Sequence, residues 1–218
     1  MRKFKFTDIL IGIVFTLLFI SIGVIAAVNF RFIYYLDVSF LKIAETSGYD
    51  RQVIIENYDA LIDYNSPFFS GELQFPTLPA SASGLQHFSE VKNIFVSFYY
   101  IGLASLVAAI GIILYKKRKR DRSYLLVTSI TVLVIPAIAA IGCAVNFDAA
   151  FVVFHKIFFR NDYWLFDPAT DPVITILPDT FFLHELIVII LFVVLGSLGL
   201  FLFSRKRPRR SYYTNRSY

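Results

Sequence analysis

The sequence predicts an all-α membrane protein with four transmembrane helices. Two extracellular segments are expected to form short interfacial helices and loops, and both termini are expected in the cytoplasm. Hydrophobic residues make up 57% of the 218-residue chain and charged residues 17%, whereas soluble domains are about 45–50% apolar and about 25% charged. Four apolar runs are long enough to cross a bilayer, which takes about 20 residues in a helix. Basic residues gather in short segments beside these runs.

The four predicted spans cover about residues 9–29, 93–115, 124–145 and 186–203, within a single integral membrane domain of residues 1–218. None has Asp, Glu, Lys, Arg or His in its interior, so no ion or proton path through the membrane centre is expected. The first run follows three basic residues, as the core of a signal peptide does. Its apolar stretch is longer than the usual core of about 7–15 residues, which favours a retained helix.

The distribution of charge predicts the orientation of the chain in the cell membrane. Residues 1–7, 116–122 and 204–218 hold 15 of the 21 Lys and Arg residues. Segments 30–92 and 146–183 hold the other six, against 13 acidic residues. Positively charged loops stay in the cytoplasm, so residues 30–92 and 146–185 are predicted to be extracellular. This topology accounts for the basic clusters, and no nucleic-acid partner is expected.

The first extracellular segment contains a predicted amphipathic helix over residues 50–65, with Asp50 as its N-cap. Further on, Ser83 and Gln86 fit a capping box that would start the helix of the second span. His87 would then lie in the first turn of that helix, where the helix dipole disfavours a protonated imidazole. A general base must be neutral, although a solvated loop histidine fits the same pattern.

The second extracellular segment concentrates ionisable and aromatic residues between two apolar runs, which is costly unless they have a function. Asp148 is predicted to cap a short interfacial helix in which Phe151 and Phe159 lie one turn either side of His155. Burial among aromatic rings lowers the pKa of a histidine below about 6.5, as a general base requires. The alternative is a structural histidine packed by aromatic rings. Trp164 is of the residue type that anchors chains at the membrane interface.

Several classes of chemistry are not indicated by the sequence. The chain has one cysteine, Cys143, which lies in an apolar run and is expected to be an inert core residue. There is no phosphate-binding loop, no Gly-x-Ser-x-Gly elbow and no His-Glu-x-x-His helix. Extracellular histidines, carboxylates and aromatic residues remain. They suit acyl or phosphoryl chemistry on a lipid-anchored substrate, with histidine as acid and base.

Four stretches of the chain have a distinctive sequence: ENYDALIDYNSPF at 56–68, HFSEVKNIF at 87–95, FHKIFFRNDYWLFDPATDP at 154–172 and ILPDTFF at 176–182. They resemble the lipoprotein intramolecular transacylase (Lit) family of Gram-positive bacteria. With the four spans they cover nearly all of the chain, and the run from 154 to 172 is specific. Glu90 stands at a position where the family is expected to have either acidic residue.

The resemblance implies a reaction on a diacylglyceryl lipoprotein that lies in the outer leaflet of the cell membrane. The sn-2 acyl chain would move from glycerol oxygen to the free α-amine of the N-terminal cysteine. The product would be a lyso-form lipoprotein. An ester becomes an amide, which is downhill, so no cofactor is expected. The expected partners are these lipoproteins and the surrounding membrane lipids.

Roles for individual residues follow as hypotheses. His155 would act as base and acid, and His87 would orient the ester, stabilise the oxyanion or share the proton. Supporting residues for the substrate, the oxyanion or the loop would come from a wider set: Arg31, Tyr58, Lys92, Arg160, Asp162, Trp164 and Asp171. No metal site is expected in this reading.

Two alternatives from other classes remain open. The first is a zinc-dependent membrane hydrolase using His87, His155 and His184 with a carboxylate, since three histidines can hold a catalytic zinc. Otherwise, His184 is expected to be an interface residue. The second alternative is a non-enzymatic membrane subunit that binds lipoproteins or peptides. Inhibition by a chelator would favour the hydrolase, and full function without the histidines would favour the subunit.

Overall fold

A computed structural model describes residues 5–205, and in this range the chain is helical and has no strand. The predictions for the terminal residues 1–4 and 206–218 lie outside the described range. The elements in chain order are α1 Phe6–Asn29, α2 Phe32–Phe40, α3 Ile43–Ser47, α4 Arg51–Tyr64, α5 Ala82–Arg118, α6 Tyr124–Val145, α7 Phe147–Phe158, the 3-10 helix η1 Pro172–Ile176 and α8 Asp179–Arg205.

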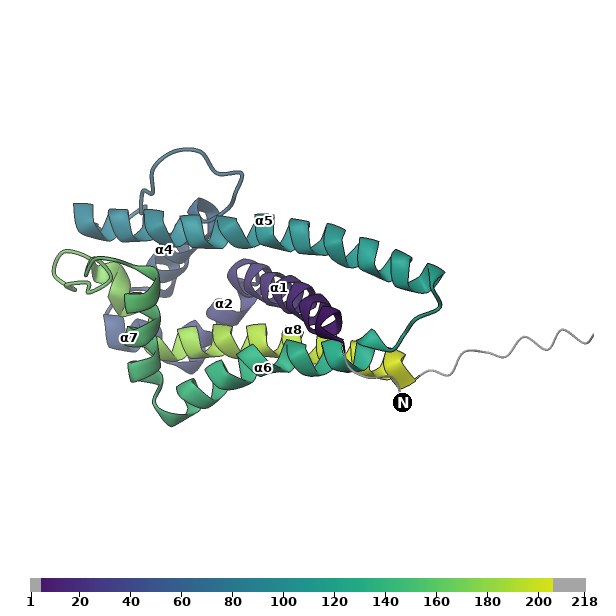
Figure 1. Cartoon of the computed structure of the whole chain (residues 1–218). Coiled ribbons are helices and arrows are strands. Elements are labelled where there is room, and N and C mark those ends of the chain that lie inside the picture. Colours follow the sequence, from purple (N-terminus) through teal and green to yellow (C-terminus); the bar gives the residue numbers. More distant parts are fainter. Residues whose placement is uncertain (1–4, 206–218) are drawn as a thin grey trace, which may run out of the picture.

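The four predicted spans are confirmed as long apolar helices. Helices α1, α5, α6 and α8 are each long and apolar enough to cross a membrane. α1 packs against the other three, so it lies at the centre of the bundle (Figure 1). The bundle core is a small set of residues: Phe15, Leu18, Ala109, Tyr124, Leu125, Val132, Val193 and Leu200. Most other apolar side chains of the spans are exposed, as expected for surfaces that face lipid.

α5 is much longer than a bilayer crossing requires. Its 37 residues extend about 55 Å at 1.5 Å per residue, against a hydrocarbon core of about 30 Å. The apolar part predicted to cross is residues 93–115, so about three turns at the N-terminal end project beyond it. His87 lies in this projecting part, outside the membrane-crossing segment.

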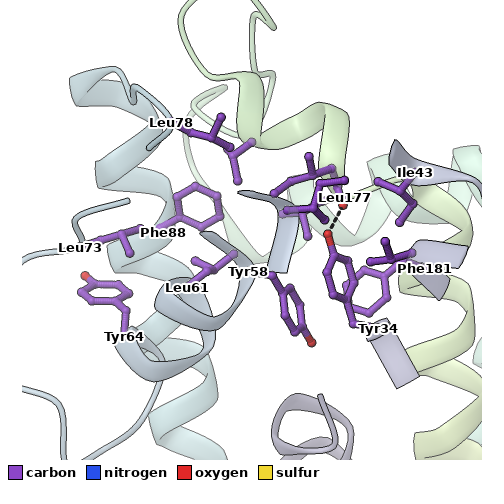
Figure 2. Close-up of a cluster of buried hydrophobic side chains, with 14 residues drawn as sticks. Tyr34, Ile43, Tyr58, Leu61, Tyr64, Leu73, Leu78, Phe88, Leu177 and Phe181 are labelled. Atoms are coloured by element: carbon purple, nitrogen blue, oxygen red, sulfur yellow. Dashed lines mark hydrogen bonds between the residues drawn. The ribbon is translucent and has the colours of Figure 1, made fainter. Parts of the chain in front are cut away.

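A second core lies beyond the ends of the spans, in what we call the cap, formed by residues 30–92 and 146–185. Its buried apolar residues come from α2, α3, α4, η1, the first two turns of α5, the first turn of α8 and the loops that precede α5 and α8. Tyr34 stacks on Tyr58 with ring centroids 3.7 Å apart, and Phe181 meets both rings edge-on (Figure 2). The Tyr34 hydroxyl donates to the Ile176 carbonyl at 2.7 Å, which ties α2 to η1.

The start of α5 differs from the sequence prediction. Ser81, rather than Ser83, is the N-cap residue, and its hydroxyl accepts the Gly84 N–H at 3.0 Å. The predicted Ser83–Gln86 capping box does not form, because the helix begins two residues earlier. Consequently His87 lies in the second turn of the helix and not in the first, which weakens the argument from the helix dipole.

The caps of two other helices also differ from the predictions. The predicted helix at 50–65 is observed as α4, and Asp50 is its N-cap residue, but the Asp50 side chain makes no cap hydrogen bond. At α7 the cap is Asn146, whose side-chain oxygen accepts the Ala149 N–H at 2.9 Å. Asp148 instead lies in the first turn. Asn146 ends α6 and starts α7, which leaves almost no linker between them.

Candidate active site

His87 of α5 and His155 of α7 lie together in the cap. Their ring centroids are 5.9 Å apart, although the two residues are separated by 68 positions in the sequence. The exposed fractions are 5% for His87 and 8% for His155, so both are buried. The sequence predicted two candidate histidines from separate segments, and the fold brings the two rings into one cluster.

The protonation pattern of His155 follows from its contacts. Its Nδ1 lies 2.8 Å from the Phe151 carbonyl oxygen, one helical turn back. A carbonyl oxygen only accepts, so Nδ1 carries the proton of the neutral imidazole. The lone pair is therefore on Nε2, which is the nitrogen available to accept a proton from a substrate. A backbone hydrogen bond of this kind also fixes the orientation of the ring.

Aromatic rings also enclose His87. The rings of Phe159 and Phe166 meet it edge-on, with centroids 4.7 and 5.5 Å away. Its Nδ1 is buried and has no hydrogen-bond partner. Buried polar atoms are nearly always satisfied, so an unpaired ring nitrogen in a site is a candidate contact for a substrate.

Both histidines favour the neutral form. Burial lowers the pKa of His87 to about 4, with a smaller contribution from repulsion by His155. Burial also lowers the pKa of His155, against the opposing effects of the Phe151 carbonyl and Asp179. Two neutral imidazoles side by side can accept one proton between them more easily than two, because the second would meet a like charge.

Trp164 forms a wall of the site against His155. Its ring centroid is 4.7 Å from that of His155, and the two ring planes are inclined by 30°. The indole nitrogen Nε1 is buried and has no hydrogen-bond acceptor. An indole N–H is a donor only, so this group can satisfy itself only with an acceptor brought by a ligand or by water. Trp164 therefore adds a second unpaired polar atom beside the histidines.

The loop that carries Trp164 is fastened to α5. The Asn161 amide donates to both carboxylate oxygens of Glu90, at 3.0 and 3.2 Å, one turn beyond His87. Farther along the loop, Phe166 stacks on Phe88 with centroids 5.3 Å apart. These contacts hold Trp164 and Phe166 in a fixed position relative to His87 of α5.

Asp171 provides the second attachment between loop and helix. It is 3% exposed, and its carboxylate accepts the Ser81 N–H at 2.7 Å and the Thr170 hydroxyl at 2.7 Å. Gly84 lets it approach, since a Cβ there would lie 2.3 Å from Asp171 Oδ1 and 3.1 Å from the Phe166 ring. Asp171 thus joins the start of α5 to the start of η1, in keeping with a loop-shaping role.

The remaining predicted support residues have other contacts in the described structure. Arg31 pairs with Asp59 at 3.1 Å and also with Asp63, which ties the start of α2 to α4. Tyr58 lies in the cap core, as described above. Lys92 donates to the Phe69 carbonyl at 3.1 Å and lies over the Tyr64 ring. The loop residues Arg160 and Asp162 are exposed.

His184 does not join the pair. Its Nδ1 lies 2.8 Å from Asp37 Oδ2, a contact that joins α8 to α2. The zinc hypothesis needs His87, His155 and His184 around one ion. Within residues 5–205, no three His, Cys, Asp or Glu side chains are grouped closely enough to hold a metal. The arrangement therefore gives that alternative no support.

The opposite face of α7 is apolar and exposed. Val153, Phe154, Ile157 and Phe158 are 46 to 70% exposed, while His155 on the same helix faces inward. α7 crosses the end of the bundle and is not a further span (Figure 1). An exposed apolar face of this kind is typical of amphipathic helices that lie in a membrane interface.

Two features of the site were not predicted from the sequence. Phe166 contacts His87, and the bond from Asn161 to Glu90 fixes the loop. Both residues lie in the stretch 154–172 that the sequence marked as unusual. The concentration of polar and aromatic residues beside Trp164 was the one signal in the sequence that this loop belongs to the site. A loop has no periodic pattern, so the sequence does not indicate which of its side chains point inward.

Comparisons with known proteins agree with this architecture. The family model described as "Lipoprotein intramolecular transacylase Lit" matches residues 9–182. A structure of the membrane-integral lipoprotein intramolecular transacylase Lit from Bacillus cereus aligns with a TM-score of 0.85 at 37% identity, covering 91% of this chain and 94% of that one.

Two structures of variants of the Bacillus cereus protein, each with one histidine replaced, also match. The arginine variant aligns with a TM-score of 0.80 at 37% identity, covering 91% of each chain. The alanine variant aligns at 0.81 and 36%, covering 91% of this chain and 92% of that one. A search of curated proteins found no match. From the family match and these structures together, we conclude that the chain belongs to the Lit family of membrane-integral lipoprotein intramolecular transacylases.

Proposed function

We propose that the protein moves the sn-2 acyl chain of a diacylglyceryl lipoprotein to the free α-amine of its N-terminal cysteine, by histidine acid–base catalysis. The observation that carries the catalytic part is the pair of buried, neutral imidazoles with centroids 5.9 Å apart. The distribution of basic residues supports a cap outside the cell and termini in the cytoplasm. The substrate would then be reached from the outer leaflet.

The first chemical step is attack of the amine nitrogen on the ester carbonyl carbon. An α-amine has a pKa near 7.7–8.0, so roughly a tenth is neutral at pH 7 without help from the enzyme. The tetrahedral intermediate must then lose a proton from nitrogen. His155 Nε2 carries the free lone pair, because Nδ1 is engaged with the Phe151 carbonyl. His155 therefore accepts that proton.

The second step is collapse of the intermediate. The C–O bond to glycerol breaks, and the leaving oxygen takes the proton that His155 holds. The products are an amide at the cysteine and a free hydroxyl on glycerol, so atoms and charges balance without a coenzyme. General acid–base catalysis of this kind contributes about 10²–10⁴ in rate.

The oxyanion needs a hydrogen-bond donor inside the site. The Trp164 indole N–H is buried without an acceptor and its ring contacts His155, so we assign it this role. His87 then orients the ester through its ring nitrogens, one of which is also unpaired. The nucleophile and the ester belong to one molecule, so the enzyme mainly has to hold a folded-back conformation.

The test is mass spectrometry of the N-terminal lipopeptide in cells that supply diacylglyceryl lipoprotein with a free amine. His155→Ala and His87→Ala should each lower the yield of the N-acylated lyso-form by at least about 10² at equal protein level. His184→Ala is the matched control. His184 pairs with Asp37 and does not join the histidine pair, so this variant is expected to retain activity. An unchanged yield in either test variant would remove that histidine from the mechanism.

A further inference from the structure

A cavity of about 680 Å³ lies at the end of the bundle opposite the cap, between α1 and α5. Its inner part is apolar and formed by Ile11, Ala108, Gly111 and Ile112. Its outer part is bounded by lysines at the ends of both helices: Lys5 caps the start of α1, Lys116 lies in the last turn of α5 and Lys119 caps its end. The transacylase reaction uses none of these residues, and the histidine site lies in the cap.

The charges of the cavity fall into two groups. Lys116 contacts Asp121 at 3.0 Å and Asp8 at 3.8 Å, so its charge is already neutralised within the protein. Lys5 and Lys119 have no ion pair among the residues that the structure describes, and both are exposed. Among residues 5–205, the three lysines that line the cavity and the two aspartates that pair with Lys116 sum to one positive charge.

The distance between the apolar part of the cavity and its lysines is similar to the distance between the acyl chains and the phosphate of a phospholipid. Gly111 and Lys119 are eight residues apart on α5, a rise of about 12 Å. The apolar part therefore lies at hydrocarbon depth when the lysines lie at headgroup depth. Gly111 faces open space, since a Cβ there would meet nothing within 4 Å.

We propose that this cavity is a binding site for one anionic phospholipid. An acyl chain would lie along the apolar part, and the phosphate would be bound by Lys5 and Lys119. A zwitterionic lipid offers the same chains, but its headgroup brings a cation to a site that already has a net positive charge. The site therefore selects for anionic lipid.

The experiment measures lipid retained by the purified full-length protein, by native mass spectrometry from micelles containing phosphatidylglycerol and phosphatidylcholine. The natural sequence should retain phosphatidylglycerol preferentially. Lys5→Gln with Lys119→Gln should lower that preference about twenty-five-fold, since each lysine near an anionic surface contributes about fivefold. Gly111→Leu should remove retention of either lipid, because its side chain fills the open groove.

Matched control variants distinguish binding in this cavity from general attraction of anionic lipid to the basic end of the bundle. Lys117→Gln with Arg118→Gln removes the same charge from positions that do not line the cavity, and should leave the preference within about twofold. Gly199→Leu adds the same side chain at another open glycine, on α8, and should leave retention unchanged. Equal loss in test and control variants would overturn the proposal.

Two further measurements complete the test. Inorganic phosphate at millimolar concentration should not displace the lipid, and displacement would show a phosphate site instead of a lipid site. Acyl transfer by the Gly111→Leu protein is measured in the same preparations and should stay within about twofold of the natural sequence, because the cavity is at the opposite end of the bundle from the histidines. Failure of lipid selectivity would therefore leave the proposed function untouched.

Discussion

The cap and the membrane bundle are packed in different ways. The cap buries large side chains completely, such as Tyr34, Ile54 and Tyr58, and links its elements through ring stacking and side-chain hydrogen bonds. The bundle buries few large residues, and its helices approach through small ones. Gly102 meets Ser21 across α1 and α5, and the Ser197 hydroxyl donates to the Ser129 carbonyl across α6 and α8. Only the cap resembles the core of a soluble domain.

The difference has a physical cause. Water drives apolar side chains together in the cap, whereas lipid tails are as apolar as the helix surfaces, so spans associate by close packing and hydrogen bonds. The histidines lie in the region where packing is dense and directional. The geometry of the site therefore depends on the packing of the cap, while the bundle supplies the helices on which the cap is built.

The largest expected effect beyond the histidines is that of Trp164→Phe. Phenylalanine keeps an aromatic ring beside His155 but has no N–H, so the proposed donor to the oxyanion is lost. Removal of one such donor typically lowers the rate about 10²–10³-fold. Single-turnover acyl transfer should fall by this factor with little change in substrate affinity.

The control for Trp164→Phe is Tyr163→Phe, which changes the exposed neighbour on the same loop and should leave the rate unchanged. Trp164 is the chain's only tryptophan, so an analogue with sulfur in place of the ring N–H can be incorporated at this position alone. A fully active analogue protein would rule out the indole N–H as the oxyanion donor.

The second prediction compares a glycine of the cap with one of the bundle. Gly84→Ala would place a Cβ 2.3 Å from Asp171 Oδ1, so the carboxylate must leave the Ser81 N–H. The lost hydrogen bond costs about 1.5–3 kcal/mol, offset by about 1 kcal/mol from the better helix propensity of alanine. Acyl transfer should fall about tenfold, because the ring of Phe166, which contacts His87, shifts with the loop.

Gly199→Ala is the matched change in the bundle, where an added Cβ meets nothing within 4 Å. It should leave acyl transfer unchanged and raise the stability by up to about 1 kcal/mol, because alanine has the better helix propensity. Comparable loss of activity in the two alanine variants would contradict the view that only the cap sets the geometry of the site.

The fluorescence of Trp164 should report the protonation of His155 as pH changes. A protonated imidazole quenches a contacting indole, so fluorescence should fall with acidification and its midpoint should lie below 6.5, since burial lowers the pKa of His155. The folded state favours both neutral histidines. Their contribution to stability is therefore present above pH 6.5 and is lost as pH falls toward the lowered pKa values.

The measurements are tryptophan emission and thermal unfolding between pH 7.5 and 5, with His155→Gln as the control that should remove the fluorescence transition. A midpoint at or above 6.5 would show that water reaches His155 freely, and that the cap does not bury the site as described.

Different parts of the structure were predictable from the sequence to different degrees. The four spans followed from length and polarity, which are properties of single segments. The sequence of each segment was enough to make His87 and His155 candidate site residues. It was not enough to predict that their rings lie together. The N-cap of α5 was missed because two serines, Ser81 and Ser83, compete as caps within three residues, and the contact of Asp171 with the Ser81 N–H favours the first. Contacts between distant segments leave no local pattern.

The smallest expected effect is that of Arg31→Gln, which tests whether a cation of the cap serves the reaction. In the described structure Arg31 pairs with Asp59 and Asp63, and no hydrogen bond, ion pair or ring contact joins it to either histidine. The pairs are partly exposed, so their loss should cost at most about 1 kcal/mol of stability. Acyl transfer should stay within about twofold of the natural sequence, measured beside an Asp63→Asn control. A loss of about 10² with an intact fold would instead make Arg31 the group that stabilises the oxyanion. Trp164 would then be left with only its packing role against His155.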